Sequence, residues 1–444
     1  MTAVLDEAAN FAAWERQIST AGGCSHPIRL RGHVTAVDLA TGEARTSYDT
    51  AAEPGGVLHV ACGNRRESVC PACSAVYKRD ARQLIRSGLV GGKGLPASVT
   101  EHPCVFATFT APSFGPVHAR RERNGKVLPC RPRRDARQRA CPHGRDISCS
   151  RRHVPDDPCL GRPMCPDCFD YESAVVFNAE APKLWRRFTT YLPRELAKMG
   201  GLTQREFRQS CKLRFVKVVE YQARGVIHYH AVIRLDLAAD DDSCLPPPPQ
   251  WTAGLLADAV TAASSAVSVL VDVGDTKRSL LLRFGAQTDT RVIRSGTETA
   301  TSRDAVANYI AKYATKDADV SGLPDYRLRS IVDVRELRCP SHTRRLIETA
   351  WDLGYRLWAH QLGRGGHFLT KSRRFSVTFG QLRTARRDHR RAQRHPDGEL
   401  DPWGRAVDET TVVFIGDWHY AGNGFQAADA HALALMSACA ARQR

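Results

Sequence analysis

No run of apolar residues in this sequence approaches the roughly 18 that a membrane-spanning helix needs. Residues 1–13 include Asp6 and Glu7 and have no apolar core, so we expect no signal peptide, no membrane partner and a cytoplasmic location. The sequence also lacks the GxxxxGKS/T pattern of phosphate-binding loops, because the glycines of residues 91–94 do not have that spacing. We therefore expect a protein without an ATPase of its own.

Acidic residues are in the minority. Asp and Glu number 47 against 64 Lys and Arg, which gives a net charge of +17 and a pI of about 9.4. This excess favours a polyanionic partner, most naturally nucleic acid. The alternative is a generally basic soluble protein from a genome that encodes much arginine.

Cysteine is abundant, and its distribution is uneven. Eleven of the 15 cysteines precede position 169, and several form CxxC pairs. In a reducing cytosol this pattern indicates zinc sites rather than disulfides. Cys70 and Cys73 form one such pair, and Cys62 and Cys24 complete a tetrahedral, structural Cys₄ site. His26 is an alternative to Cys24.

A second group of ligands lies in residues 113–170, a polar stretch without periodicity. It holds more candidates than one zinc needs, and includes His118 and Cys130. The favoured four are Cys141, Cys149, Cys165 and Cys168, with His143 and His153 as substitutes, and Cys159 is not expected to be a ligand. One zinc is favoured over two. Because this polar stretch cannot build an apolar core, a structural metal gives it a reason to fold.

Hydrophobic periodicity predicts an α+β fold. Buried strands are expected at 104–111, 213–221, 226–235 and 283–293, and helices at 74–87, 172–199, 251–271, 303–316 and 341–362. This order is typical of an antiparallel sheet with helices packed against it.

The hairpin formed by the two middle strands carries a candidate metal site. His228 and His230 are two apart on a strand, so their side chains point to the same face. Glu220, eight residues before His228, shares that face if the turn has an odd number of residues. Two imidazoles and a carboxylate suit Mg²⁺ or Mn²⁺ with positions left open for phosphate oxygens. The alternative is histidines with ordinary hydrogen bonds.

Two tyrosines are spaced one helical turn apart. Tyr309 and Tyr313 lie on one helix face, and each is followed three residues later by a lysine, Lys312 or Lys316. Nearby ammonium groups favour a phenolate, which can attack a phosphodiester to give a 5′-phosphotyrosine and a free 3′-hydroxyl. The alternative is an amphipathic helix with packed tyrosines and solvated lysines.

The C-terminal part is strongly basic. Residues 371–394 contain nine Lys or Arg and one Asp, and Phe368, Phe375 and Phe379 interleave with the charges. Cations for phosphates and aromatic rings for unstacked bases suit single-stranded or melted DNA. The expected DNA-binding residues are Lys371, Arg373, Arg374, Arg383, Arg386 and Arg387. A solvated helix face is the alternative.

Three motifs in this order resemble the HUH endonucleases, named for two histidines that flank a bulky hydrophobic residue. Thr108–Pro112 is similar to their first motif, His228–His230 to the second and Tyr309–Tyr313 to the two-tyrosine form of the third. Over most of its length the chain resembles replication initiator (Rep) proteins of actinobacterial rolling-circle plasmids and integrative conjugative elements. The similar segments include Cys24–Leu30, Cys62–Arg66, Cys70–Cys73, Thr110–His118, Cys165–Tyr171 and Gly366–Arg374.

The resemblance implies an HUH-like sheet, sequence-specific nicking and rejoining of origin DNA, and host helicase and polymerase as partners. We expect three segments: an N-terminal zinc module and helix (1–100), a nuclease domain (101–335) with the insertion at about 113–170, and a basic DNA-binding region (336–444). A two-tyrosine HUH transposase and a non-catalytic, zinc-containing DNA-binding regulator are the alternatives.

Overall fold

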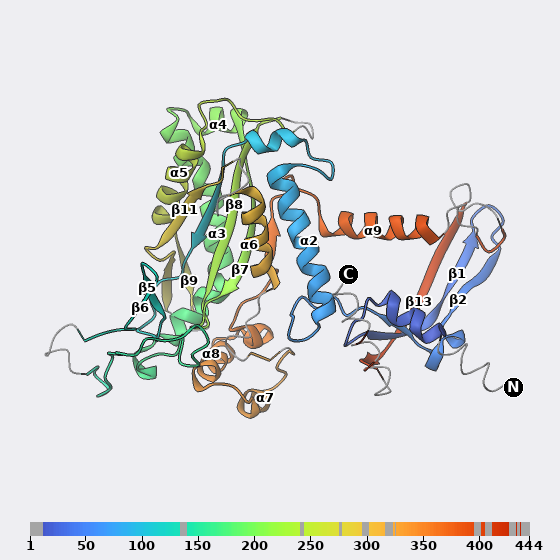
Figure 1. Ribbon diagram of the computed structural model, residues 1–444, viewed down its shortest axis with the longest axis horizontal. Helices are drawn as coiled ribbons and strands as arrows, with labels where there is room; N and C mark the ends of the chain where they lie inside the picture. The colour runs from blue at the N-terminus through green and yellow to red at the C-terminus, as the bar shows by residue number, and fades with distance from the viewer. Residues whose placement is uncertain are drawn as a thin grey trace. The chain divides into compact units, whose positions relative to one another are not determined.

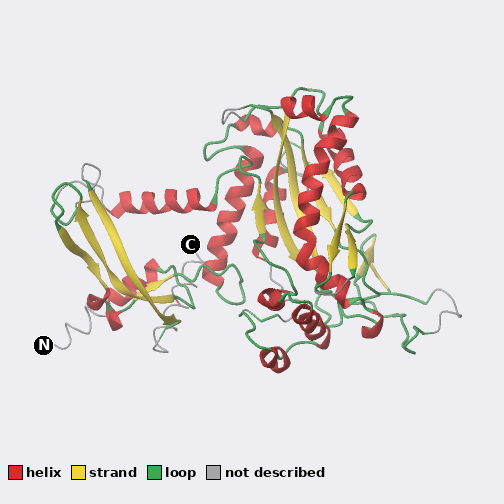
Figure 2. Cartoon of the chain, turned by 180° about the vertical axis from the view of Figure 1, so that it is seen from behind, coloured by secondary structure: helices red, strands yellow, loops and turns green. Residues whose placement is uncertain are grey.

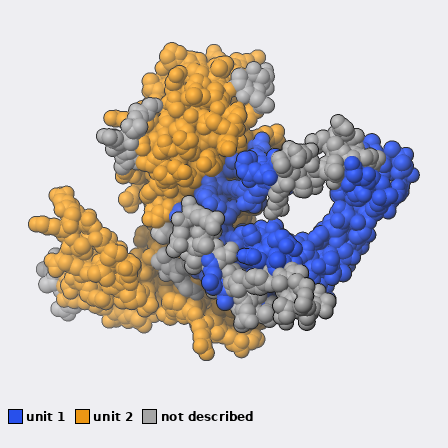
Figure 3. Space-filling model, turned by 45° about the vertical axis from the view of Figure 1, so that its right-hand side comes forward, with its two compact units in different colours: residues 1–80, 378–444 blue, residues 81–377 orange. Residues whose placement is uncertain are grey.

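The computed structural model describes residues 12–133, 140–239, 244–274, 278–294, 302–315, 323–324, 326–394, 401–404 and 411–425, and also residues 432 and 436. The chain folds into two compact units, shown in different colours in Figure 3. Unit 1 comprises residues 1–80 and 378–444, and unit 2 comprises residues 81–377. The sequence suggests three consecutive segments instead, because it does not reveal that the two ends of the chain belong to one unit.

Unit 2 is built on a five-stranded sheet in the order β11-β4-β8-β7-β12, and every neighbouring pair is antiparallel. The strands are β4 (Cys104–Phe109), β7 (Cys211–Tyr221), β8 (Ile227–Leu237), β11 (Thr288–Val292) and β12 (Leu369–Lys371). The central strands β4, β7 and β8 are apolar and mostly buried, as strands covered on both faces must be. The predicted α+β class with an antiparallel sheet is confirmed.

Helices lie on both faces of this sheet. On one face, α3 (Tyr171–Met199) and α5 (Ala253–Ala266) bury aromatic and aliphatic side chains, with Trp185 and Phe188 of α3 packed edge-on against Phe109 of β4. On the other face lies α6 (Arg303–Thr315), which contacts β7. Figure 1 shows α6 in front of the sheet, and Figure 2 shows the opposite face.

Smaller elements complete unit 2. They are the hairpins β5 (Arg121–Arg123) with β6 (Lys126–Leu128) and β9 (Ser268–Asp272) with β10 (Ser279–Arg283), and the helices α4 (Gln204–Ser210), α7 (Ile331–Glu336) and α8 (Ser341–Asp352). The predicted helix at 251–271 is shorter than expected, because Val267 takes an extended conformation and a strand follows. The predicted helix at 341–362 also ends early, at Asp352, and a 3-10 helix (Arg356–Gln361) comes after it.

Unit 1 contains a second antiparallel sheet, which the hydrophobic pattern of the sequence does not predict. Its strands are β1 (Ile28–Asp38), β2 (Ala44–Asp49), β3 (Leu58–Val60) and β13 (Val412–Asn423), and β1 pairs with β13 along its whole length. The unit also contains α9 (Phe379–Arg394) and the beginning of α2 (Pro71–Val90). Within the described residues, no helix is both long and apolar enough to cross a membrane.

Candidate functional site

The β7–β8 hairpin brings Glu220, His228 and His230 together. Glu220 stands directly opposite His228 in the strand register, and Val218 stands opposite His230. Glu220 Oε2 lies 2.7 Å from His228 Nε2 and 3.0 Å from His230 Nε2. One ligand atom of each residue lies within 4.8 Å of the others. We call these three residues the metal trio, because two imidazole nitrogens and one carboxylate oxygen converge on one point.

Burial and a neighbouring hydroxyl hold the metal trio in place. Glu220 and His230 are only 6% and 3% exposed. Thr108 of β4 pairs with His230 across the strands, and its Oγ1 lies 3.1 Å from His230 Nδ1. When Nδ1–H donates to this oxygen, the lone pair on Nε2 points toward the other two ligands, which is how outer partners orient metal-binding histidines. The donor set and this orientation fit a divalent cation.

Helix α6 presents both tyrosines to the metal trio. The Tyr313 ring lies 4.8 Å from the His230 ring and the Tyr309 ring 5.7 Å from it, centroid to centroid. The two phenol rings are 4.6 Å apart. Tyr309 is 44% exposed, whereas Tyr313 is half-buried. Burial, a hydrogen bond with Tyr309 and the charge of Glu220 raise the pKa of Tyr313.

The position of α6 is set at its first turns. Arg303 is buried and donates to the carbonyl oxygen of Leu89 at 3.1 Å, and Arg86 forms a 2.7 Å ion pair with Asp304. The buried side chains of the helix, among them Ile310, lock its inner face. Lys312 is exposed in the last turn. Lys316, the other predicted lysine, lies outside the described residues.

Four cysteines of unit 1 form the first cluster. Cys24, Cys62, Cys70 and Cys73 place their sulfurs within 4.8 Å of one another. The Cys62–Cys73 and Cys24–Cys70 sulfur pairs are each 3.7 Å apart. Tetrahedral zinc with Zn–S bonds of about 2.3 Å requires sulfurs about 3.8 Å apart. The set is the one predicted from the sequence, with Cys24 rather than His26 as the fourth member.

The insertion contains two clusters instead of one. The second cluster consists of Cys141, His143, Cys165 and Cys168, and the third cluster consists of His118, Cys130, Cys149 and His153. In the second, His143 Nδ1 lies 3.2 Å from Cys168 Sγ. The favoured set of four is therefore wrong in one member, since Cys149 lies in the third cluster and His143 takes its place. His153 likewise belongs with Cys149. Cys159 belongs to neither cluster.

The predicted DNA-binding residues differ in their surroundings. Lys371 is half-buried, and its Nζ donates to the carbonyl oxygens of Arg373 and Ser376, so it holds its own loop. Arg373 and Arg374 are exposed and lie in unit 2. The other three belong to α9 in unit 1, where Arg386 forms an ion pair with the buried Asp80, and Arg383 and Arg387 are exposed.

Two of the three interleaved phenylalanines are buried and the third is half-buried, which corrects the prediction that all three stack on bases. Phe368 and Phe375 are 6% and 0% exposed. The Phe375 ring fills the space beside Gly88, where a Cβ would lie 2.3 Å from it. Phe379 stacks on Tyr77 at 5.1 Å. Apolar rings that can be buried beside a basic segment become part of the core, and the charges alone remain outside.

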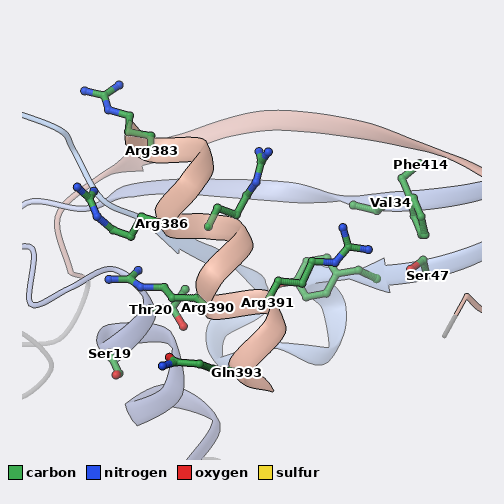
Figure 4. A pocket seen from close by; sticks show the side chains of 12 residues that line it. Ser19, Thr20, Val34, Ser47, Arg383, Arg386, Arg390, Arg391, Gln393 and Phe414 are labelled. Atoms are coloured by element: carbon green, nitrogen blue, oxygen red, sulfur yellow. The ribbon is translucent and has the colours of Figure 1, made fainter. Parts of the chain in front are cut away.

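Helix α9 and the unit 1 sheet enclose a groove of about 980 Å³. One wall is formed by five arginines of α9, and the facing wall includes Tyr48 of β2 and Phe414 of β13. Figure 4 shows Phe414 and Ser47 on the strands beside the helix. The arginines are Arg383, Arg386, Arg387, Arg390 and Arg391. At 3.6 residues per turn they lie within about 140° of the helix circumference.

Two comparisons with known proteins both match replication initiator proteins. A family model described as "Replication initiator protein, pSAM2" (RepSA) matches residues 10–439. A replication initiator protein of Streptomyces ambofaciens is 44% identical over 430 residues, which cover 94% of this chain and 88% of the relative. No solved structure gives a significant match. Because the match extends over nearly the whole chain, the protein belongs to the RepSA family of replication initiator proteins.

Proposed function

We propose that this replication initiator nicks and rejoins single-stranded origin DNA by the rolling-circle mechanism, through a 5′-phosphotyrosine intermediate. The observation that carries the proposal is the meeting of two tyrosine rings with the metal trio on one face of the sheet. Glu220, His228 and His230 would hold Mg²⁺ or Mn²⁺, which when bound supplies Lewis-acid polarisation of the scissile phosphate.

The tyrosines act as nucleophiles. Oη of Tyr309 or Tyr313 loses its proton and attacks phosphorus, a Tyr–O–P bond forms, and the P–O3′ bond breaks. The 3′-oxygen takes up a proton and leaves as a hydroxyl group. A later attack by a 3′-hydroxyl on the phosphotyrosine reverses these bonds and rejoins a strand, so no nucleotide hydrolysis is required. Two adjacent tyrosines allow two successive transfers by one chain.

Electrostatics support a role for the cation in this step. The pKa of Tyr313 is raised by burial, by the hydrogen bond with Tyr309 and by the negative charge of Glu220. A cation held by Glu220 offsets that charge and favours the phenolate. Tyr309, which is more exposed, is accessible to a DNA strand.

The groove beside α9 supports DNA binding by unit 1. Its arginines suit phosphates, and Tyr48 and Phe414 offer aromatic rings for bases. A groove of about 980 Å³ suits a short unpaired stretch better than a duplex, which is about 20 Å across. The first and second clusters would hold structural zinc ions. Host helicase and polymerase would complete replication.

A covalent-adduct assay tests the proposal. The full chain is incubated with single-stranded origin DNA and Mn²⁺, and an adduct that survives SDS is sought. We expect the adduct with the wild-type chain, and none with the double variant Tyr309→Phe, Tyr313→Phe. Full cleavage by the double variant would refute the nucleophile assignment, and full metal-dependent cleavage by His228→Ala would refute the metal trio. DNA binding without any adduct would favour a non-catalytic regulator.

The single variants test whether either tyrosine can act alone. Each retains one phenol, so we expect each to form an adduct while losing the second transfer. The family match favours an initiator over a transposase, although both would use the same chemistry.

A further inference from the structure

The third cluster has the spacing of a zinc site. His118, Cys130, Cys149 and His153 each offer a ligand atom, and these atoms lie within 4.8 Å of one another. Cys149 Sγ is 3.6 Å from His153 Nε2. Zinc bonds of about 2.3 Å to sulfur and 2.0 Å to nitrogen place two tetrahedral ligands about 3.5 Å apart.

The two histidines of this cluster are prepared for a metal in different ways. His153 is 1% exposed, and its Nδ1 lies 2.7 Å from Asp157 Oδ2, which leaves Nε2 directed at Cys149. A carboxylate behind a histidine is the usual arrangement at zinc. His118 Nδ1 is buried and has no hydrogen-bond partner among the described residues. Such a nitrogen is costly unless a ligand satisfies it.

Among the described residues, the chain around the cluster has a small apolar core. Cys130 and Cys149 are buried there, together with Met164 and the partly buried Ile147. Backbone bonds between Arg131 and Cys149 link the two cysteine segments. The β5–β6 hairpin lies between His118 and Cys130 and brings these two ligands together.

We infer that the third cluster binds its own zinc ion as a Cys₂His₂ site, and that this ion positions the β7–β8 turn behind the metal trio. The insertion then contains two structural zinc ions, and the three cysteine clusters of the described residues together hold three. The positioning role rests on the proposed function, whereas the zinc site itself does not.

A short path connects His118 to the turn. The Gly161 amide donates to the His118 carbonyl oxygen at 2.8 Å. Gly161 has φ +79, and a Cβ at this position would lie 2.1 Å from the carbonyl carbon of Ala223. The backbone of the insertion therefore packs directly on the turn that joins Glu220 of β7 to His228 of β8.

The turn is also held from other sides. The Arg224 guanidinium donates to the carbonyl oxygens of Ala111 and Pro112, which follow the end of β4. Asn178 of α3 donates to the Gly225 carbonyl oxygen at 2.9 Å. His342 of α8 also lies 3.0 Å from the Arg224 carbonyl oxygen, so the insertion adds one contact among several, at Ala223. Loss of the third zinc releases this contact and loosens the turn between two metal ligands.

Zinc content tests the site. We expect three zinc ions per full-length wild-type chain by inductively coupled plasma mass spectrometry, and two in the double variant Cys130→Ser, Cys149→Ser. Cys159→Ser is the matched control, because this thiol lies in the same insertion outside both clusters, and it should keep three. Two zinc ions in the wild type and an unchanged count in the double variant would overturn the site.

Binding of Mn²⁺ tests the positioning role without relying on nicking. Titration followed by electron paramagnetic resonance should show Mn²⁺ affinity falling about tenfold or more in the double variant, the range seen when support of a metal ligand is lost. Gly161→Ala should weaken Mn²⁺ binding similarly while keeping three zinc ions, which covers the case in which the double variant does not fold. Unchanged Mn²⁺ affinity in Gly161→Ala would overturn the positioning role. A wild-type chain that binds three zinc ions but no Mn²⁺ would instead contradict the proposed function.

Discussion

Thr108→Val removes one hydroxyl group beside the metal trio and nothing else of comparable size. The Thr108 Oγ1 lies 3.1 Å from His230 Nδ1. His230 is 3% exposed, so water cannot readily replace the lost partner. A buried polar group left without a partner costs about 1–3 kcal/mol. Loss of an outer partner of a metal ligand typically weakens metal binding 10–100-fold, which is about 1.4–2.7 kcal/mol. The cost of the unpaired histidine nitrogen and the expected loss of metal-binding free energy are therefore of the same size.

We therefore expect Thr108→Val to raise the Kd for Mn²⁺ about 10–100-fold, as measured by calorimetric titration of the full chain. Nicking should need correspondingly more Mn²⁺ but should approach the wild-type rate at saturation, because the tyrosines are untouched. Thr108→Ser keeps the hydroxyl group and should bind Mn²⁺ like the wild type.

A second control comes from the same strand end. Thr110 donates its hydroxyl to the Gln287 carbonyl oxygen at 2.6 Å, whereas the Thr108 hydroxyl lies beside His230. Thr110→Val should therefore leave Mn²⁺ binding unchanged. If Thr108→Val binds Mn²⁺ within twofold of the wild type, then His230 is not oriented through Nδ1 and the reasoning fails.

Three further predictions concern stability and DNA binding. Burial lowers the pKa of Lys217 from 10.5 to about 7. Between these two pH values the unfolded chain holds a proton that the folded chain has lost, so the unfolding free energy should rise with pH, relative to Lys217→Met, by about 1.4 kcal/mol per pH unit. Urea unfolding of both proteins at pH 7 and 9 should show this rise, and a difference between them that does not change with pH would contradict it. Asp236 is buried between Arg234 and His102. Asp236→Asn should lower the unfolding free energy at pH 7 by about 3–5 kcal/mol, because the buried Arg234 charge loses its partner. A loss below about 1 kcal/mol would contradict this expectation. The double variant Arg387→Gln, Arg390→Gln should bind single-stranded DNA more weakly and reduce the slope of log K against log salt by about 1.4, and an unchanged slope would place the DNA elsewhere.

Local spacing in the sequence was sufficient to predict that the two histidines share one face of a strand and that the two tyrosines share one face of a helix. Alternation along a strand places His228 and His230 on one face, and a spacing of four places Tyr309 and Tyr313 on one side of a helix. Glu220 was a candidate only if the turn had an odd number of residues, and the strand register meets that condition, because Glu220 stands opposite His228. These relations depend only on backbone geometry over a few residues. The role of Thr108 could not be found in this way, because its partner lies on a strand more than a hundred residues away.

The insertion shows where sequence reasoning stops. Its cysteines and histidines are recognisable as ligands, but the stretch has no periodicity, and nothing in the spacing sorts eight ligands into two sets. The β5–β6 hairpin brings Cys130 to His118, and backbone pairing of Arg131 with Cys149 brings in Cys149. The same limit explains the phenylalanines of the basic segment, since only the packed core decides that Phe375 is buried beside Gly88.

The sequence by itself determined which residues are candidates for the chemistry, because residue type and local repeat are properties of the chain. It determined the α+β class for the same reason. Tertiary structure alone decided which distant residues meet: β13 with β1 in one sheet, Cys149 with His118 rather than Cys141, and α6 over the face that carries the metal trio. Those encounters join residues far apart in the chain, and the burial of apolar surface selects them, which no local pattern encodes.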